Sequence, residues 1–327
     1  MDTEYNLYVI ASPLQLINAQ EAVKKFSLNK NILVIIDTAG KNNTLQVNKV
    51  LKKSFFQDII RIESSKKSRF FIYVKLIKQL QKKSYNKVFL GNFGSINHMI
   101  ASNVNLKKLY LIDDGTITIS IYEGLIKRFQ TKFNMKKIRF YLFGLTTELK
   151  HTLNYFTVFR LPAKENVEIL HNDYSYLKKE YSIKDFEKDK KIVYFLGQPL
   201  VENSLITKEN YSKYMQEVIQ YFKGNKIIYI PHRSEIFTDK IDSFVNENFV
   251  IQQSTIPVEL LFLEDKVAPS IVSSFVSTAL FTMEEIFHEK TEVISFKVEE
   301  SDFLKDTEIY STYYKYLEKT SVRMVQL

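Results

Sequence analysis

The sequence predicts an α/β fold with two Rossmann-like domains that face each other across a cleft. Continuous apolar runs, typical of buried parallel strands, alternate with segments of helical periodicity along most of the chain. The alternation stops once, in a charge-dense segment at residues 171–191, and then starts again. The 327 residues are enough for two domains with separate cores. We therefore expect an N-terminal domain at residues 1–178 and a C-terminal domain at residues 179–327.

In the first half, the clearest helix signal follows the first apolar run directly. Ser12 is suited to cap a helix and Pro13 to occupy its first turn, and apolar residues at helical spacing continue to Phe26. Further helices are predicted around residues 45–51 and at residues 70–80 and 95–103. Strands are predicted at residues 6–11, 32–36, 59–62, 87–90, 109–112, 155–161 and 167–170.

Residues 124–145 have a different pattern, in which apolar and basic residues interleave. Such a segment can rest on anionic lipid headgroups as a basic amphipathic surface. It can equally be a core-facing helix with a solvated lysine face, which is the commoner case. The sequence leaves both interpretations open.

The second half repeats the alternation. Strands are predicted at residues 192–196, 226–230, 249–251, 270–272 and 293–296. Helices are predicted at residues 207–222, 240–245, 258–263, 275–287 and 302–317. Two such halves in succession, without an internal repeat, are what predicts twin Rossmann-like domains.

Composition excludes several kinds of site. The chain has no cysteine, so disulfides and cysteine-based zinc sites are excluded, and a reducing compartment is favoured. Its five histidines show no metal-ligand spacing, so we expect neither a bound metal nor another cofactor. The acidic N-terminus does not look like a signal peptide, and no apolar run approaches the ~20 residues that span a bilayer. We therefore expect a cytoplasmic protein.

The net charge of +9 favours anionic partners: phosphates, nucleic acid or an acidic membrane surface. A soluble, lysine-rich surface explains the charge equally well. The lysines are dispersed and no RNA-binding aromatic motif is present, which argues against nucleic acid. A peripheral contact with an anionic membrane and a homodimer are both compatible with the sequence.

Two carboxylates and a glycine, Asp113, Asp114 and Gly115, directly follow the apolar run at residues 109–112. In open α/β sheets, ligands collect beyond the carboxyl ends of the strands. A carboxylate there can act as a proton acceptor, and a neighbouring carboxylate raises the pKa of one of the pair. The alternative is an ordinary Asp-Gly turn in which an aspartate caps the next helix.

A second apolar run, residues 227–230, ends in Pro231, His232 and Arg233. Proline fixes the direction of the chain, histidine can act as an acid, and the arginine fork suits phosphate oxygens. We interpret His232 as a catalytic acid and Asp114 as a base that faces it across the cleft.

The chain contains neither of the glycine-rich nucleotide motifs, GxGxxG and GxxxxGK[ST]. Gly197 and Gln198 follow the apolar run at residues 192–196 and are a weaker signal. The glycine can form a tight turn that lets a ligand approach the backbone.

Hydroxyl groups gather at a later junction between strand and helix. Ser273 and Ser274, with Ser277 and Thr278 one turn on, can bind an anion together with the amides of a helix N-terminus. Simple capping by serine is the alternative. Upstream, Glu259 opens a helix and can either accept hydrogen bonds from a ribose or interact with the helix dipole.

Six short motifs occur in an order that resembles the bacterial sialyltransferases, in particular the lipooligosaccharide sialyltransferases of glycosyltransferase family 52. They are Pro-Leu-Gln-Leu at 13–16, Asp-Asp-Gly at 113–115, Gly-Gln-Pro-Leu at 197–200, Pro-His at 231–232, Pro-Val-Glu at 257–259 and Ser-Ser at 273–274. Each is weak alone, but together they cover most of the chain. One departure is that the family's His-Pro pair reads His232-Arg233 here.

The resemblance implies a GT-B fold, CMP-sialic acid as the donor, and inverting transfer to a sugar hydroxyl without an essential metal. It implies that Asp114 is the general base and that His232 neutralises the departing CMP phosphate. The phosphate would be held by Ser273 and Ser274. The remaining implied roles belong to the donor side, at Gly197, Gln198, Pro231, Arg233 and Glu259, and to the acceptor side, at Gln15, Asp113 and Gly115.

We therefore expect a sialyltransferase that acts on an oligosaccharide or glycolipid acceptor, with a galactose terminus, in lipooligosaccharide or capsule synthesis. The first alternative is a GT-B enzyme with another nucleotide sugar, such as a glucosyl or galactosyl donor, because one fold supports many donors. The second, from a different class, is a basic protein without enzymatic activity that binds anionic lipid or nucleic acid.

Overall fold

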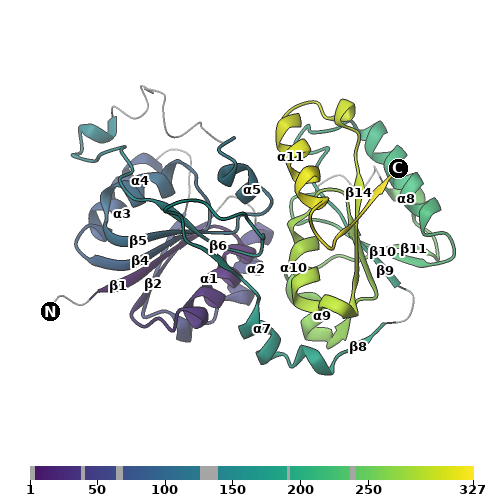
Figure 1. The fold of residues 1–327 in the computed structure, drawn as a ribbon, viewed down its shortest axis with the longest axis horizontal. Helices are drawn as coiled ribbons and strands as arrows, with labels where there is room; N and C mark the ends of the chain where they lie inside the picture. The colour runs from purple at the N-terminus through teal and green to yellow at the C-terminus, as the bar shows by residue number, and fades with distance from the viewer. Residues whose placement is uncertain (1–3, 38–40, 64–68, 126–138, 190–191, 236–240) are drawn as a thin grey trace. The chain divides into compact units, whose positions relative to one another are not determined.

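The computed structural model describes residues 4–37, 41–63, 69–125, 139–189, 192–235 and 241–327. The chain divides into two compact units: Met1–Asp114 with Ile121–Tyr176, and Gly115–Ser120 with Leu177–Leu327. The change from one unit to the other falls between Tyr176 and Leu177, two residues before the domain boundary expected from the sequence. Each unit is an α/β assembly around its own parallel sheet (Figure 1).

The first unit contains a sheet of seven strands in the order β3-β2-β1-β4-β5-β6-β7, and all neighbouring pairs are parallel. Its central strands are apolar and covered on both faces, as in other parallel sheets. The strands are β1 (Tyr5–Ile10), β2 (Asn31–Asp37), β3 (Asp58–Glu63), β4 (Ser84–Leu90), β5 (Asn105–Ile112), β6 (Leu153–Thr157) and β7 (Ile169–His171).

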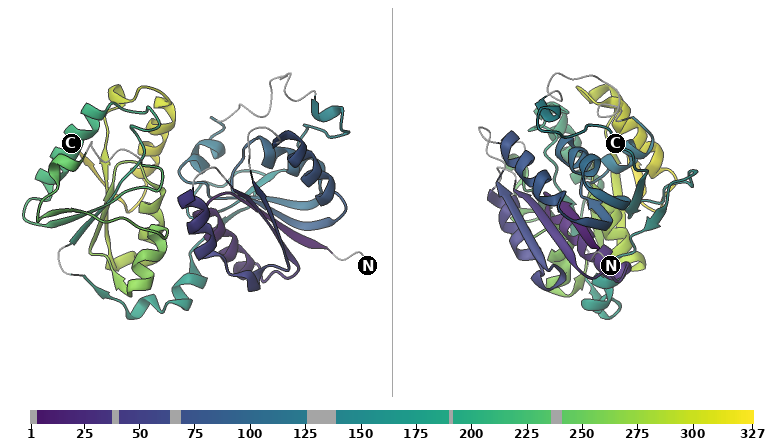
Figure 2. Two further views of the ribbon diagram at one scale, coloured as in Figure 1. Left: turned by 180° about the vertical axis from the view of Figure 1, so that it is seen from behind. Right: turned by 90° about the vertical axis from the view of Figure 1, so that its left-hand side faces the viewer.

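Helices cover both faces of this sheet, with α1 and α2 on one face and α3 and α4 on the other (Figures 1 and 2). The predicted cap of the first helix is confirmed, because the Ser12 hydroxyl accepts a hydrogen bond from Gln15 N at 3.3 Å and Pro13 opens the helix. The helices are α1 (Pro13–Lys25), α2 (Lys41–Val50), η1 (Lys53–Phe55), α3 (Arg69–Leu80) and α4 (Ser95–Asn103). The short helix α5 (Ile117–Tyr122) begins in the segment that belongs to the second unit.

The second unit contains a parallel sheet of six strands in the order β11-β10-β9-β13-β14-β15. The short strands β8 and β12 form a separate parallel pair, in which β8 is the first strand of this unit along the chain. The strands are β8 (Glu187–Lys188), β9 (Ile192–Leu196), β10 (Lys226–Ile230), β11 (Phe249–Ile251), β12 (Val267–Ala268), β13 (Ile271–Ser274), β14 (Glu292–Lys297) and β15 (Arg323–Gln326).

In this unit α8 lies on one face of the sheet and α9, α10 and α11 on the other (Figure 1). The core is rich in aromatic rings: Phe275, at 0% exposure, packs against Phe195 at 5.1 Å and Tyr211 at 5.5 Å between ring centroids. The helices are α8 (Lys208–Tyr221), η4 (Asp242–Phe244), α9 (Val258–Asp265), α10 (Thr278–Phe287), η5 (His288–Lys290), η6 (Glu300–Asp302) and α11 (Thr307–Leu317).

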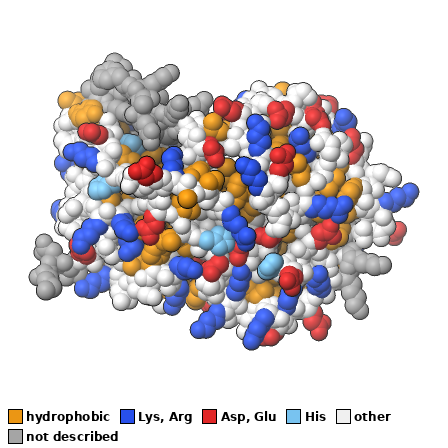
Figure 3. All heavy atoms as spheres, in the orientation of Figure 1, with side chains coloured by type: hydrophobic (Ala, Val, Ile, Leu, Met, Phe, Trp, Pro, Cys, Tyr) orange, Lys and Arg blue, Asp and Glu red, His pale blue; other side chains and the backbone are white. Residues whose placement is uncertain are grey.

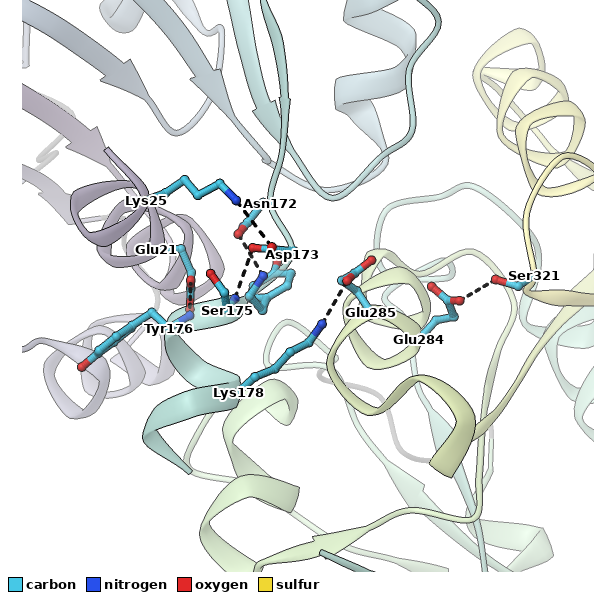
Figure 4. Close-up of polar contacts among 11 residues, drawn as sticks. Glu21, Lys25, Asn172, Asp173, Ser175, Tyr176, Lys178, Glu284, Glu285 and Ser321 are labelled. Carbon is cyan, nitrogen blue, oxygen red and sulfur yellow. Dashed lines mark hydrogen bonds and ion pairs between the residues drawn. The ribbon is translucent and has the colours of Figure 1, made fainter. Parts of the chain in front are cut away.

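The charge-dense segment expected as a linker contains α7 (Ser175–Glu180) and η3 (Ile183–Asp185). Within the first unit, Glu21 accepts a hydrogen bond from Tyr176 N at 3.1 Å (Figure 4). Within the second, Lys178 pairs with Glu285 of α10 at 3.0 Å. Tyr176 of α7 is therefore bound to a residue of the first unit and Lys178 to a residue of the second. Polar contacts of this kind explain why charged residues replace an apolar pattern in this segment.

Most predicted elements are confirmed, with shifts of a few residues at their ends. The helix predicted at residues 240–245 is wrong, since only the single turn η4 forms there. The segments α5, α7, β8, β12 and β15 had no sequence prediction, because each is short and lacks a full period. Of the basic segment at 124–145, residues 126–138 lie outside the described residues.

Candidate functional site

The two aspartates at the end of β5 have different surroundings. Asp113 is 1% exposed. Its carboxylate accepts hydrogen bonds from the Thr157 hydroxyl at 2.5 Å and from Val158 N at 2.7 Å, which ties β5 to the end of β6. The side chain of Asp113 therefore makes structural contacts that hold the turn in shape. The acceptor-side role expected for Asp113 stays a prediction.

Asp114, by contrast, is exposed, and its carboxylate accepts a hydrogen bond from the side-chain amide of Gln15. The same amide group is oriented by its own oxygen, which accepts from Ala11 N at 2.6 Å. Gln15 is itself 1% exposed and fits because Gly91 is a glycine: a Cβ there would lie 2.3 Å from Gln15 Oε1. The buried glutamine thus fixes one orientation of an exposed carboxylate.

Gly115 completes this turn with φ +92°, a conformation that favours glycine over any residue with a side chain. Behind it lies a buried polar network centred on Asn18 of α1. The Asn18 oxygen accepts from Tyr174 Oη at 2.9 Å and from Asn172 Nδ2 at 3.1 Å, and its amide donates to the Asp113 carbonyl at 3.4 Å. These bonds hold the backbone of the turn in place beneath Asp114.

The turn after β10 depends on Glu235, to which the sequence pattern assigned no role. Its carboxylate accepts hydrogen bonds from His232 N at 2.6 Å and from the Tyr229 hydroxyl at 2.8 Å. Tyr229 is fully buried, and its hydroxyl also lies 2.6 Å from that of Tyr211. Burial raises the pKa of both tyrosines far above the ordinary range, so both stay neutral hydrogen-bonding groups.

His232 is half-buried beside Pro231, which is half-buried as well. Its Nδ1 accepts a hydrogen bond from Ser234 N at 3.1 Å, and Glu235 N donates to its carbonyl at 2.8 Å. With Nδ1 as an acceptor, the neutral ring carries its proton on Nε2. His232 is therefore held in the tautomer that can donate a hydrogen bond through Nε2.

Gly197 lies against this network. A Cβ on Gly197 would meet Glu235 Oε2 at 2.3 Å and the Tyr229 hydroxyl at 2.4 Å. The close approach that glycine permits here is therefore made by the protein's own groups. Gly197 thus makes room for the Glu235 carboxylate that binds the His232 amide, and its expected donor-side role stays a prediction.

Gln198 bridges two loops of the same unit. Its oxygen accepts from Val276 N at 2.8 Å, and its amide donates to the Val276 carbonyl. The side chain thereby joins the loop after β9 to the loop between β13 and α10. Its expected contact with the donor stays a prediction.

Ser273 and Ser274 end β13 just before α10, at the junction of strand and helix expected from the sequence. Both are 0% exposed. The Ser274 hydroxyl donates to the Leu196 carbonyl at 2.7 Å, whereas that of Ser273 has no partner among the described residues. Ser277 is the residue that caps α10, by accepting from Ala279 N at 3.2 Å.

Glu259, in the first turn of α9, is 6% exposed. Burial raises its pKa above the ordinary range of glutamate, while its own amide, the nearby Arg233 and the Thr282 hydroxyl lower the pKa in part. Arg233 is exposed, and its positive charge is the one that lowers the pKa of the buried Glu259 carboxyl. A buried carboxyl with one neighbouring cation can accept hydrogen bonds from ligand hydroxyls.

Within the second unit, the structure brings the predicted donor-side residues to one edge. Strands β10, β9 and β13 are neighbours in the sheet, and all three end at this edge because they are parallel. Their ends carry His232, Gly197 and Ser274.

Among the residues that the structure describes, no group of three His, Asp or Glu side chains could hold a metal ion.

Residues 6–295 match the sequence model of the alpha-2,8-polysialyltransferase family, which spans most of the chain. The chain belongs to this family. It is a glycosyltransferase of the sialyltransferase type, so the predicted enzyme class is confirmed at that level. The narrower likeness to the lipooligosaccharide sialyltransferases stays a prediction. A search of curated proteins finds no match.

Solved structures are similar to this polysialyltransferase-family chain, and the first of the two named here supports its fold. A putative UDP-N-acetylglucosamine 2-epimerase from Listeria monocytogenes aligns with 98% of the chain and 90% of its own, at 11% identity and a TM-score of 0.57. The GT-B domain of a sialyltransferase from Photobacterium damselae aligns with 99% of the chain and 100% of its own, at 11% identity and a TM-score of 0.48. The predicted GT-B class, with two Rossmann-like units, is confirmed.

Several functional candidates of this family member were not foreseen. Thr157 and Tyr211 make contacts with residues far away in the sequence, Asp113 and Tyr229. Glu235 contacts Tyr229 and His232 within its own turn. One signal was present: Glu235 lies three residues after His232, the spacing at which a side chain can return to a backbone amide in a tight turn.

No described helix has the length and apolar character required to cross a bilayer.

Proposed function

We propose that the chain transfers sialic acid from CMP-sialic acid to a hydroxyl of a cell-surface glycan, with inversion and without an essential metal. The observation that carries the proposal is the end of β5. There, an exposed carboxylate is oriented by a buried glutamine amide while its neighbour is locked in the core. The family match supports the same conclusion, because residues 6–295 include every motif of the expected site.

In the proposed reaction, the Asp114 carboxylate takes the proton of the acceptor hydroxyl as that oxygen attacks the sialic acid. The bond from the sugar to the phosphate breaks in the same displacement, through a centre with oxocarbenium character. A single displacement inverts the configuration. Negative charge then develops on the CMP phosphate, and His232 stabilises it through the proton on Nε2.

The donor is proposed to bind at the carboxyl edge of β10, β9 and β13. The amides at the start of α10 and the positive end of its dipole favour the phosphate there. Of the two serines, Ser273 has the hydroxyl that can turn toward an anion, because Ser274 already donates to Leu196. Glu259 is proposed to accept hydrogen bonds from the ribose, with Arg233 at its side.

The family's description names alpha-2,8 linkage, which favours an acceptor that ends in sialic acid over one that ends in galactose. A glycan that already carries sialic acid is anionic, as is the donor. The net charge of +9 is complementary to both. A site of action at the cytoplasmic face of the membrane, a role in lipooligosaccharide or capsule synthesis and a homodimer remain part of this proposal.

The test is to measure CMP release with two acceptors of equal length, one ending in sialic acid and one in galactose. We expect release from CMP-sialic acid with at least one of them, and faster release with the sialylated acceptor. UDP-glucose and UDP-galactose are the control donors. Transfer from either UDP sugar, with none from CMP-sialic acid, would establish the alternative donor class and refute the proposal.

A further inference from the structure

One part of the first unit exposes an unusual number of large apolar side chains. Phe71 is 64% exposed, Tyr141 55%, Leu142 81% and Phe143 39%. These are four of the nine large hydrophobic residues that are exposed among the described residues. The rings of Phe71 and Phe143 lie 5.9 Å apart, so helix α3 and the turn at 140–144 form one surface. We call these four residues the aromatic patch. Figure 3 shows exposed hydrophobic side chains on one face of the molecule.

The patch is held by a defined turn. Gly144, at φ +67°, donates to the Tyr141 carbonyl at 2.9 Å, and Leu145 N donates to the Phe140 carbonyl at 3.1 Å. This pair of bonds is the Schellman motif that ends helices. Leu145 is 1% exposed, whereas Leu142, three residues earlier, points to solvent. The turn therefore buries Leu145 and exposes Leu142 to solvent.

Cations surround the patch. On α3, the spacing of Phe71, Lys75 and Lys78 places all three on one face, and all three are exposed. A Cβ on Gly144 would lie 3.8 Å from Lys78 Nζ, so this ammonium group reaches the turn itself. The guanidinium of Arg139 stacks over the Phe70 ring at 4.4 Å.

Acidic residues are absent from both stretches of sequence, 69–83 and 139–147. Among the described residues, no carboxylate pairs with Lys75 or Lys78. A basic surface of this kind, with an exposed leucine and aromatic rings at its centre, combines the two interactions that hold proteins at lipid headgroups. Apolar side chains enter the interface, and each lysine or arginine near anionic lipid contributes about 1 kcal/mol.

We propose that the aromatic patch and the cations around it dock the first unit on a membrane that contains anionic phospholipid. A polyanionic glycan would account for the cations but not for Leu142. The proposal is independent of the donor and of the linkage formed, because no residue of the proposed site takes part in it.

The experiment is flotation of the full chain with vesicles. Vesicles of phosphatidylcholine mixed with phosphatidylglycerol are compared with vesicles of phosphatidylcholine alone, at low and high salt. We expect binding to the anionic vesicles and weaker binding at high salt. Leu142→Ser should lower the partition coefficient roughly tenfold, since burial of a leucine contributes about 1.5–3 kcal/mol when complete.

The double variant Lys75→Glu/Lys78→Glu should lose most of the binding, because it reverses the charge of the surface. Leu45→Ser is the matched control, since Leu45 is 56% exposed on α2 of the same unit and should leave binding unchanged. All variants should unfold thermally at the wild-type temperature, which shows that they are folded whatever donor the chain uses.

Three results would overturn the proposal. The first is a wild-type chain that binds neither kind of vesicle. The second is an equal loss of binding with Leu45→Ser and Leu142→Ser. The third is self-association in the absence of lipid that Leu142→Ser abolishes, because the patch would then be an interface between two copies of the chain.

Discussion

The turns at the ends of β5 and β10 are each held by a carboxylate that accepts two hydrogen bonds, but the two carboxylates join different parts of the fold. In each, one carboxylate accepts a hydrogen bond from a backbone amide and another from a hydroxyl: Asp113 from Val158 N and Thr157, Glu235 from His232 N and Tyr229. Each turn presents a second titratable group, Asp114 or His232. The carboxylate that shapes the turn is thus distinct from the group proposed to react.

The difference lies in what each carboxylate joins. Asp113 connects its strand to the neighbouring strand β6, so it fixes the sheet edge and leaves the orientation of Asp114 to Gln15. Glu235 returns to the residue proposed to react and binds its backbone directly. A loss at Asp113 should therefore destabilise the fold, whereas a loss at Glu235 should mainly misplace His232. The predictions below test this distinction, from the largest expected effect to the smallest.

The largest effect is expected for Asp114→Asn. It removes the proposed base while Gln15 can still contact the side chain, so turnover should fall by roughly 10²–10⁴-fold. The KM for the donor should hardly change. The measurement is the rate of CMP release at saturating donor and acceptor.

Asp113→Asn is the matched comparison for that variant. Its neutral amide leaves a buried donor without a full partner, which costs about 1–3 kcal/mol of unfolding free energy. Thermal unfolding should detect this loss, and turnover at low temperature should stay within tenfold of normal. If Asp113→Asn abolished turnover in a folded protein while Asp114→Asn did not, the assignment of the two aspartates would be reversed.

The second prediction concerns His232→Ala. The proposed hydrogen bond strengthens as charge develops on the leaving phosphate, so turnover should fall by roughly 10²–10³-fold with a much smaller change in donor KM. A donor analogue with a better leaving group should recover part of the rate. Loss that appears only in KM would make His232 a ground-state binding residue.

Much of this comparison could be drawn from the sequence, because strands β5 and β10 are apolar runs that end abruptly in ionisable residues. Asp114 and His232 were proposed as the reacting groups in that way. The contacts of Asp113, Gly197, Gln198 and Ser274 could not be predicted, since each depends on a partner from another strand or loop that spacing along the chain does not reveal. Local patterns locate strand ends, whereas tertiary contacts decide which side chain there is buried.

The third prediction concerns Glu235 as a positioning residue. Glu235→Ala removes both hydrogen bonds beneath His232, so the ring loses its fixed place and turnover should fall roughly 10- to 100-fold. Glu235→Gln should recover most of the rate, because its amide oxygen can still accept from His232 N. Tyr211→Phe should have less effect still, because the Tyr211 hydroxyl contacts Glu235 only through the hydroxyl of Tyr229.

A merely structural role for Glu235 would give a different result. Glu235→Ala would then lower the melting temperature without a change in turnover per folded molecule. Turnover corrected for the folded fraction, measured alongside thermal unfolding, separates the two cases.

The smallest effect is expected at Glu259, and it should depend on pH. Burial raises the pKa of this carboxyl above the ordinary glutamate range, so its charge is lost at a higher pH than that of an exposed glutamate. If the carboxylate accepts hydrogen bonds from the donor's ribose, donor KM should rise as the pH falls through that raised pKa. Glu259→Gln should show a raised KM at neutral pH, by roughly three- to tenfold for the loss of one hydrogen bond, and no further rise in acid. The decisive measurement is donor KM against pH for both proteins. The same acid dependence in Glu259→Gln would assign the titration to another group and remove Glu259 from the ribose site.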